Sequence, residues 1–497
     1  MTDLTYDLAI IGAGPGGYHA AIRAAQYGAK VALIEKDELG GTCLNRGCIP
    51  TKALYASAQL IQKIKDFQEF GIEIKDYELN FEKAVKRKNR VVQTLVNGIA
   101  TLERSWKNDI YFGHGKIIGG NIHSGFELSI QGKDNTTIKS KRVIIATGSS
   151  PALIPIFNID HERILTSDDI LEPNFTTIPK RLLIIGAGVI GCEFANIFAT
   201  FGSKVIMLEY LASPIATEEP MIVKEIVKKF QKLDIEIHTA QNVLSVENTG
   251  SLVKVITVSS SIPRDQIVSA EESIFEADLC LVSIGRVKDS KDLGLENLGI
   301  KTDRGAIKCD PHTLETSVKG IYAIGDVTGG LMLAHVAYYE ADISVANALV
   351  SIGGFPVKGQ IADYRTVPAA IFTSPIVSSV GLRRKSAKDR GIDLLMGQFP
   401  YESLGKAQCL GELEGFIMTL AERESLKIVG ASCIGFDAPE LIAELALAMK
   451  NGLTINDVRN TIHCHPTMSE LVLEGCESVV GTAIHRKGRP IYNKSKD

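Results

Sequence analysis

Cys43 and Cys48 stand five positions apart in residues 40–52, and this spacing limits what the two thiols can do together. Five residues of a regular helix rise ~7.5 Å, whereas a disulfide tolerates a Cα separation of at most about 7 Å. The thiols can pair only if the backbone bends, and Gly47 permits a bend. Pro50 suits the first turn of a helix, where the dipole would favour a Cys48 thiolate. We therefore expect a reducible disulfide; two buried structural cysteines are the alternative.

A second candidate for chemistry lies near the C-terminus, where His465 precedes Pro466 and is followed by Glu470. Pro466 would hold His465 extended just before a helix, with Glu470 little more than one turn in. A carboxylate that orients an imidazole makes a general-base pair. A surface histidine that caps a helix is the alternative. A metal site is less favoured, because successive side chains of an extended segment diverge, so His463, Cys464 and His465 converge poorly.

The elements that must position the two cysteines begin with a nucleotide-binding unit directly before them. Its regular elements are a buried strand over 6–11, a helix over 18–27 and a strand over 30–34. The turn between the first two fits G-x-G-x-x-G. Gly12 would make the turn, Gly14 would admit a pyrophosphate and Gly17 would let helix and strand pack, while Glu35 can accept from ribose hydroxyls.

The same unit recurs later, with a strand over 181–185, a helix through Phe201 and a strand over 204–208. Its glycines are Gly186, Gly188 and Gly191. Glu209 would bond a free ribose 2′-hydroxyl and repel a 2′-phosphate, and residues 210–220 contain no Arg or Lys, which favours NAD over NADP. Glu193 lies just inside the helix, where the helix dipole alone could explain an acid. Two such sites and a reactive disulfide imply electron transfer between two cofactors.

The rest of the chain supplies scaffold and a further domain. We expect helices over 54–105, short strands over 110–145 that end with a return to the first sheet, and buried strands over 279–284 and 321–324. Asp326 follows the last of these and suits a cofactor hydroxyl, although an ordinary Asp turn explains it equally well. From residue 351 we expect an association domain. Its expected elements are strands over 366–372, 415–421 and 426–434 and helices over 438–451 and 466–477.

The totals exclude several classes of protein. The chain has 497 residues and a net charge of −4, without a long basic run, which argues against nucleic acid as a partner. Its apolar runs fall short of the ~20 residues of a membrane helix, and no targeting segment is visible at the polar N-terminus. Apart from the 43/48 pair, the nine cysteines are scattered, so a cytoplasmic, reducing compartment is expected.

With these motifs in order, the sequence resembles the pyridine nucleotide-disulfide oxidoreductases over nearly its whole length, and within them the branch that oxidises dihydrolipoamide. The most specific motifs are residues 40–52, 186–191, 323–327 and 465–470. The resemblance implies an α/β fold with two Rossmann-like dinucleotide-binding domains and a C-terminal α+β dimerisation domain. The implied boundaries are 1–150 and 281–350 for the two parts of the FAD domain, 151–280 for the NAD domain and 351–497 for the dimerisation domain.

The resemblance also implies roles for single residues. Cys43 would exchange with the substrate, Cys48 would face the flavin, and Lys52 would lie against the flavin and pair with Glu193. In a head-to-tail homodimer, His465 of one subunit would work beside the cysteines of the other. FAD would contact Gly12, Gly14, Gly17, Glu35, Thr42, Lys52, Gly115, Thr147, Gly148, Ser149, Asp326, Met332, Leu333, Ala334 and His335. NAD would contact Gly186, Gly188, Gly191, Glu193, Glu209, Val243 and Gly285.

The implied reaction is oxidation of protein-bound dihydrolipoamide to lipoamide with reduction of NAD⁺ to NADH. The implied partners are lipoyl domains of 2-oxo acid dehydrogenase complexes or the glycine cleavage H protein. Two alternatives remain. Another flavin-dependent disulfide reductase, of glutathione or mercuric type, would carry arginines beyond the second fingerprint or a C-terminal cysteine pair, and neither is present here. A non-catalytic, flavin-loaded subunit of a complex would have no need of Cys43, Cys48, His465 and Glu470.

Overall fold

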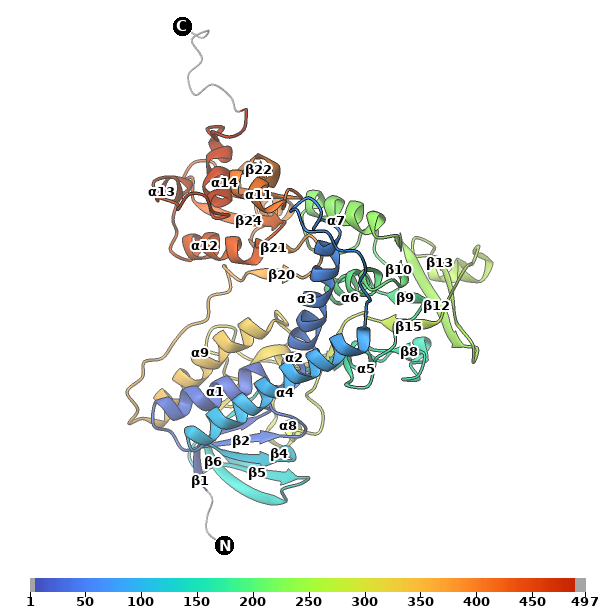
Figure 1. Cartoon of the computed structure of the whole chain (residues 1–497). Helices are drawn as coiled ribbons and strands as arrows, with labels where there is room; N and C mark the ends of the chain where they lie inside the picture. The colour runs from blue at the N-terminus through green and yellow to red at the C-terminus, as the bar shows by residue number, and fades with distance from the viewer. Residues whose placement is uncertain (1–4, 488–497) are drawn as a thin grey trace.

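The structure is a computed structural model that describes residues 5–487 (Figure 1). Residues 1–4 and 488–497, at the outer ends of the first and last expected domains, lie outside the described residues. Two units built on mainly parallel sheets lie beside a C-terminal domain built on an antiparallel sheet. The expected α/β architecture is confirmed. Among residues 5–487, none of the helices has the length and apolar character needed to cross a bilayer.

The first unit is organised around a buried central strand, β1 (Thr5–Ile11). Its sheet has the order β3-β2-β1-β6-β5-β4, with β19 paired to β6. The other strands are β2 (Val31–Glu35), β3 (Asp109–Phe112), β4 (His114–Asn121), β5 (Gly125–Gln131), β6 (Thr136–Ile145) and β19 (Ile321–Ala323). Leu8 and Ile10 pack toward α1 (Pro15–Gln26) and α9 (Ala334–Ile352), while alternate β1 residues face β4 and β5. β6 pairs with β1 and β19 pairs with β6, so two segments that are distant in sequence join this sheet.

The second unit has a parallel sheet in the order β11-β10-β9-β15-β8. Its strands are β8 (Ile164–Leu165), β9 (Arg181–Ile185), β10 (Lys204–Leu208), β11 (Ile235–His238) and β15 (Leu279–Val282). An antiparallel sheet adjoins it, made of β12 (Gln241–Asn248), β13 (Val253–Ser259) and β14 (Ser273–Ala277). The helices are α5 (Ser167–Leu171), α6 (Val189–Thr200) and α7 (Pro220–Lys232).

The C-terminal domain carries an antiparallel sheet in the order β20-β21-β24-β23-β22. Its strands are β20 (Ala369–Ile371), β21 (Val377–Gly381), β22 (Leu394–Pro400), β23 (Phe416–Glu422) and β24 (Ile428–Ile434). Its helices are α10 (Arg384–Asp389), α11 (Gly405–Leu410), α12 (Ala438–Lys450), α13 (Ile455–Arg459) and α14 (Glu470–Val480). Short elements between the domains include β7 (Ser149–Pro151), which pairs with β16 (Arg286–Lys288), α8 (Leu295–Leu298), and β17 (Thr302–Asp303), which pairs with β18 (Ala306–Ile307).

Three expected elements differ from the structure. The helical stretch 54–105 is two helices, α3 (Cys48–Ile64) and α4 (Phe81–Ser105), because the Asn80 side chain caps a new helix start. The strand expected over 366–372 shrinks to β20, since the Phe372 amide donates to Glu193 and not to a neighbouring strand. The helix expected from 466 begins only at Glu470, whose carboxylate accepts from the Thr467 amide.

One hydrophobic cluster joins the three parts. Leu54 and Tyr55 of α3 belong to the same buried cluster as Phe194 of α6 and Phe416 of β23. The Tyr55 hydroxyl also donates to the Thr373 carbonyl oxygen at 2.7 Å. The helix that begins at Cys48 is therefore fixed against both the second unit and the C-terminal domain.

Candidate active site

The backbone bends between the two cysteines at the residue that the sequence indicated. Cys43 lies in α2 (Gly41–Arg46) and Cys48 is the first residue of α3, with Gly47 between them at φ −149° and ψ −113°. A Cβ at Gly47 would lie 3.0 Å from the Thr42 carbonyl oxygen. Glycine therefore lets the two helices meet closely, and the expected bend is confirmed.

The two thiols are chemically unequal. A hydrogen bond from Cys43, reinforced by the positive charge of Lys52, lowers the pKa of Cys48 to about 7. The same hydrogen bond, together with burial, raises the pKa of Cys43. In the reduced pair the negative charge therefore resides on Cys48 and the proton on Cys43. This asymmetry suits an electron-donating Cys48 and a substrate-exchanging Cys43.

Lys52 lies one turn beyond Cys48 and forms an ion pair with Glu193. Its Nζ is 2.8 Å and 3.0 Å from the two carboxylate oxygens, and it lies 4.6 Å from the centre of the Phe372 ring. The Glu193 side chain is 5% exposed and also accepts from the Phe372 amide at 3.0 Å. Glu193 is the fifth residue of α6, beyond the first turn, so the helix dipole does not explain it. Its charge is balanced by Lys52, which joins α3 to the second unit.

The first glycine-rich turn, residues 12–17, has a shape that suits a bound phosphate. We call it the first cradle, and the matching turn over residues 186–191 the second cradle. Gly12 has φ +99°, and a Cβ there would lie 2.4 Å from the Ala146 carbonyl oxygen. A Cβ at Gly17 would lie 1.8 Å from the carbonyl oxygen of Gly12. Gly14 differs, because a Cβ there would have its nearest neighbour, the Cα of Gly41, at 3.9 Å. Gly14 immediately precedes α1. Two glycines are thus required by packing, and the third leaves room at a helix N-terminus, as a pyrophosphate needs.

The second turn repeats this geometry. Gly186 has φ +100°, and a Cβ there would meet the neighbouring backbone at 2.6 Å. At Gly191 the closest approach would be 2.0 Å, whereas at Gly188 no atom of residues 5–487 other than those of Gly188 and its two chain neighbours lies within 4 Å. The Glu209 carboxylate accepts from the Ala187 amide at 2.7 Å. Each turn is therefore braced by the acid after its second strand and leaves its middle glycine accessible.

The acid of the first turn has the same bracing role. One Glu35 oxygen accepts from the Ala13 amide at 2.6 Å and the other accepts from the Asp37 amide at 2.8 Å. Burial raises the pKa of Glu35. A ribose contact would add to these bonds, and it stays a prediction.

A polar network links the cysteine stretch to the expected flavin residues. The Ser149 hydroxyl donates to Asp326 at 2.5 Å and accepts from Arg286 Nε at 2.8 Å. The Thr42 hydroxyl donates to the Ser149 carbonyl oxygen at 3.4 Å. Sequence reasoning missed Arg286, although it directly follows Gly285 at the end of a buried stretch. The network places Thr42, Ser149 and Asp326 together, as residues that share one ligand would be.

The remaining expected cofactor residues lie at element ends or on sheets. Thr147 donates to the Asp289 carbonyl oxygen at 2.6 Å, and His335, in the first turn of α9, bonds to the Pro368 carbonyl oxygen at 2.8 Å. A Cβ at Gly115 in β4 would lie 3.0 Å from the Ile34 side chain. Gly148, Gly285, Met332, Leu333 and Ala334 lie in turns or at the start of α9, and Val243 lies in β12. Their contacts with cofactors stay predictions.

A tyrosine pair that sequence reasoning missed borders the dithiol. The Tyr18 and Tyr338 hydroxyls are 2.8 Å apart, and the rings are edge to face. Burial raises the pKa of Tyr18, and the nearby Cys43 side chain adds to this shift. The pKa of Tyr338 is also raised, first by burial and then by Tyr18, with contributions from Cys43 and Cys48. The two residues are 320 positions apart, so no local pattern could have paired them.

His465 and Glu470 form the expected couple. Nδ1 of His465 lies 2.9 Å from Oε1 of Glu470, and the imidazole side chain is 77% exposed. Burial opposes ionisation of Glu470, but the bonds from His465 and Thr467 outweigh it and lower the pKa. His463 bonds to a different carboxylate, Glu444, at 3.0 Å. The two imidazoles therefore do not share a metal-binding geometry.

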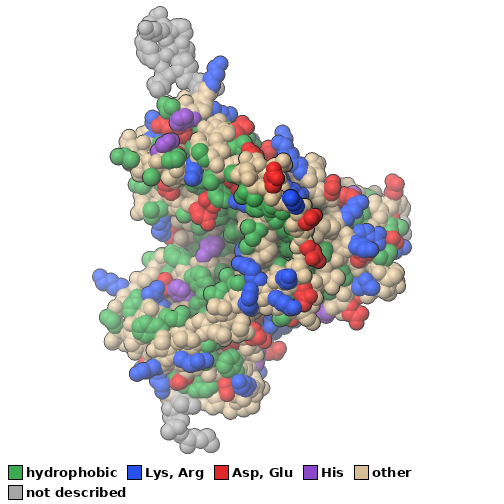
Figure 2. Space-filling view, in the orientation of Figure 1, with side chains coloured by type: hydrophobic (Ala, Val, Ile, Leu, Met, Phe, Trp, Pro, Cys, Tyr) green, Lys and Arg blue, Asp and Glu red, His purple; other side chains and the backbone are tan. Residues whose placement is uncertain are grey.

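The chain does not bring His465 to its own cysteine pair. Figure 1 shows α14 in the C-terminal domain, well apart from α2 and the start of α3. Figure 2 shows the face between these regions hollowed, with hydrophobic side chains gathered in the hollow. The exposed His465 on one domain and the half-buried Cys43 on another suit a site that two subunits complete.

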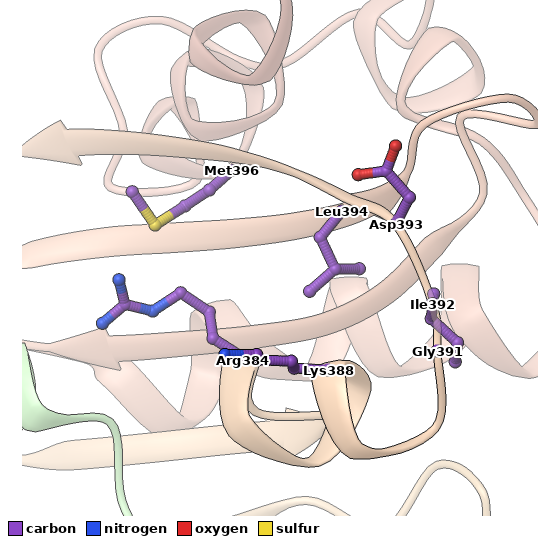
Figure 3. Close-up of a pocket in the computed structure, with 7 residues that line it drawn as sticks. All are labelled: Arg384, Lys388, Gly391, Ile392, Asp393, Leu394 and Met396. Carbon is purple, nitrogen blue, oxygen red and sulfur yellow. The ribbon is translucent and has the colours of Figure 1, made fainter.

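A pocket in the C-terminal domain is separate from these residues. Figure 3 shows it between α10 and β22, lined by Arg384, Lys388, Gly391, Ile392, Asp393, Leu394 and Met396. None of the expected site residues lines it. This pocket is therefore not part of the candidate site.

Comparisons with known proteins agree with this geometry. The family model for the pyridine nucleotide-disulphide oxidoreductases matches residues 6–341, and the model for the dimerisation domain of that family matches residues 367–475. The dihydrolipoyl dehydrogenase of Chlamydia muridarum is 41% identical over 483 residues, covering 97% of this chain and 98% of that protein. One from Bacillus subtilis is 39% identical over 485 residues, with 97% and 99% covered.

Solved structures show the same architecture. LpdA from Mycobacterium tuberculosis superposes with a TM-score of 0.86 at 25% identity, covering 95% of this chain and 98% of that one. The HOCl-induced flavoprotein disulfide reductase RclA from Escherichia coli superposes with a TM-score of 0.80 at 30% identity, covering 94% and 98%.

Proposed function

This chain belongs to the family of pyridine nucleotide-disulphide oxidoreductases, and we propose that it is a dihydrolipoyl dehydrogenase. It oxidises protein-bound dihydrolipoamide to lipoamide and reduces NAD⁺ to NADH. Its cofactors are FAD, in the first cradle, and NAD(H), in the second. The dimerisation domain supports a homodimer.

One observation carries the proposal: the cysteine stretch contacts the first cradle and the helix that follows the second cradle. A Cβ at Gly41, at the start of α2, would lie 2.6 Å from the Cα of Gly14 in the first cradle. At the other end of the stretch, Lys52 pairs with Glu193 on the helix that begins at the second cradle. A dithiol with one low-pKa sulfur therefore lies between two dinucleotide-binding turns, as a relay between substrate and two cofactors requires.

The residues of the chain account for the thiol chemistry. The partner subunit's His465, held by its carboxylate neighbour, accepts a proton from one substrate thiol. The resulting thiolate attacks Cys43, the Cys43–Cys48 bond breaks, and Cys48 leaves as the thiolate that its lowered pKa favours. The second substrate thiol then attacks the mixed disulfide, closes the lipoamide ring and leaves its proton on Cys43. The pair ends as one thiol and one thiolate.

The cofactors complete the transfer. Gly14, Thr42, Lys52, Ser149 and Asp326 would hold FAD, and Gly188 and Glu209 would hold NAD⁺. When bound, FAD would accept two electrons from a thiolate and donate a hydride to the nicotinamide. Lys52 and Glu193 orient the helix that carries Cys48, and the charge of Lys52 keeps that sulfur ionised.

Glu209 favours NAD⁺ as the acceptor. Its two oxygens accept from the amides of Ala187 and Leu211 at 2.7 Å and 2.8 Å, which fixes a negative charge where a ribose 2′-phosphate would approach. Arg383 and Arg384, which reach the far end of the following loop, are paired with glutamates. NADP would therefore meet an uncompensated carboxylate.

The substrate is expected on a lipoyl domain of a 2-oxo acid dehydrogenase complex or of the glycine cleavage H protein, in the cytoplasm. A second candidate is a different disulfide reductase, because the RclA structures share the fold at 29–30% identity. The dihydrolipoyl dehydrogenases are more similar in sequence, at 37–41%, and we favour their reaction.

A substrate comparison tests the proposal. The purified yellow protein is assayed with dihydrolipoamide and NAD⁺, beside glutathione disulfide with NADPH. We expect NADH formation in the first assay and little turnover in the second. A flavin spectrum without NAD⁺-dependent oxidation of dihydrolipoamide would contradict the proposal and favour a non-catalytic subunit.

A further inference from the structure

Two adjacent arginines of the C-terminal domain bind two adjacent glutamates of the second unit. Arg383 Nη2 lies 3.1 Å from Glu218 Oε1, and Arg384 Nε lies 2.9 Å from Glu219 Oε2. The arginines stand at the start of α10, and the glutamates directly precede α7. Figure 3 shows Arg384 extending from α10 along the wall of the nearby pocket. We call these four residues the Arg-Glu clamp.

The glutamates of the clamp are buried, with side chains 6% and 2% exposed. Glu218 also accepts from the Ser379 hydroxyl at 3.1 Å, and Glu219 also accepts from the Arg384 amide at 2.6 Å. Buried carboxylates need such partners, because an unpaired buried charge is strongly unfavourable. The clamp therefore fixes the chain before α7 in one position against the C-terminal domain.

A chain of backbone hydrogen bonds runs from the clamp to the second cradle. The Glu218 amide donates to the Ile215 carbonyl oxygen at 2.9 Å, and the Ile215 amide donates to the Ala187 carbonyl oxygen at 2.9 Å. The Ala187 amide in turn donates to Glu209 at 2.7 Å. Ala187 stands between the first two glycines of the cradle, and Ile215 is buried. The loop over 209–219 is thus held near Glu209 by the cradle and by backbone hydrogen bonds to residues 238–241, and at its other end by the clamp.

We propose that Arg383 and Arg384 are positioning residues of the NAD⁺ site, so that the dimerisation domain sets the geometry of the loop that carries Glu209. This inference rests on the proposed use of the second cradle by NAD⁺. Loss of the clamp frees the loop and weakens NAD⁺ and NADH binding. The cysteine stretch and the first cradle do not depend on this loop, so dihydrolipoamide still reduces the enzyme at the usual rate.

The chain offers a matched control at the other end of the same helix. Lys229 and Lys232 of α7 bind Glu414 of the C-terminal domain at 2.8 Å and 3.1 Å. This contact joins the same two parts of the molecule, but it lies at the C-terminal end of α7, away from the loop over 209–219. A Glu414→Gln change loosens the domain contact without loosening the loop.

The experiment compares Arg383→Gln/Arg384→Gln, the near-isosteric Glu219→Gln and the control Glu414→Gln, each as the flavin-loaded dimer. For the double arginine variant we expect the KM for NAD⁺ and the Kd for NADH to rise about 10-fold. The kcat at saturating NAD⁺ and the rapid-mixing rate of reduction by dihydrolipoamide should stay within about two-fold of wild type. Glu219→Gln should shift both constants in the same direction, and Arg384→Lys should raise them less than Arg384→Gln does.

Unchanged NADH affinity in folded Arg383→Gln/Arg384→Gln and Glu219→Gln enzymes would overturn the inference. An equal loss in Glu414→Gln would also overturn it, because general loosening of the domains would then suffice. The Kd for NADH is measured by fluorescence titration and needs no dihydrolipoamide turnover. A failure of the proposed reaction is therefore distinguishable from a failure of the clamp.

Discussion

At the residue scale, the division of labour between the cysteines follows from their neighbours. Cys48 has a pKa of about 7 because Cys43 donates to it and Lys52 lies nearby, while the charge of Glu193 acts in the opposite direction. Lys52 thus favours the thiolate, and Glu193 keeps Lys52 in place. Loss of the Lys52 charge should therefore raise the pKa of Cys48, and loss of the Glu193 charge should lower it.

Changing Lys52 to Met should raise the pKa of Cys48. We expect the pH midpoint for alkylation of the reduced enzyme by iodoacetamide to rise by roughly one unit from its wild-type value near 7. Glu193→Gln should lower the midpoint, because the Glu193 charge raises the pKa of Cys48. Mass spectrometry of the modified peptide identifies the reacting cysteine. A midpoint that falls in the Lys52→Met enzyme would show that Lys52 does not stabilise the thiolate.

Much of the residue-level site is local in sequence and could be predicted for that reason. The bend at Gly47 follows from two cysteines five positions apart, and the His465–Glu470 pair follows from its spacing. Arg286 and Tyr338 could not be found this way. Arg286 reaches Ser149 across 137 positions, and Tyr338 reaches Tyr18 across 320. The pairing of β7 with β16 brings Arg286 to Ser149, and the packing of α9 on α1 brings Tyr338 to Tyr18.

At the element scale, α4 holds a buried carboxyl group outside the active site. Oε2 of Glu103 accepts from Asn108 at 2.6 Å, whereas Oε1 is buried without a partner among residues 5–487. Burial raises the pKa of Glu103 from 4.5 to about 7. The folded state therefore holds an extra proton between these pH values, and stability falls as pH rises through this window.

Glu103→Gln should remove this loss, because glutamine is neutral at every pH and can still accept from Asn108. The variant should gain stability over wild type as pH rises from about 5 to about 8, by as much as about 3 kcal/mol. Calorimetric Tm values at both pH values test this, with Glu82→Gln at the exposed start of α4 as control. A Tm difference that does not grow with pH would mean that Glu103 is ionised in the folded protein at no cost.

Elements with a strong local signal were predicted well, and those shaped by distant contacts were not. Both strand–turn–helix–strand units lie where the glycines and acids placed them. The break before α4 depends on the Asn80 cap, and the short β20 depends on the bond from Phe372 to Glu193, 179 positions away. Periodicity alone does not contain such tertiary contacts.

At the scale of the whole molecule, we propose that two subunits complete the active site. His465 is exposed on the domain that the family uses for dimerisation, while Cys43 and Cys48 belong to a different part of the chain (Figure 1). The hydrophobic hollow between these parts (Figure 2) suits the binding of a second copy of the chain. The sequence predicted this arrangement only through the family resemblance, because no pattern within one chain records a contact with another.

Hybrid dimers test this central claim most directly. Subunits with Cys48→Ser and subunits with His465→Gln are each expected to be inactive with dihydrolipoamide as homodimers while keeping their FAD. If each site combines the cysteine pair of one subunit with His465 of the partner subunit, a hybrid contains one intact site. Random mixing of equal amounts should then restore about a quarter of wild-type NAD⁺-dependent activity. If the base acts within its own subunit, every site in the mixture is defective, and no activity above that of the separate variants would contradict the account.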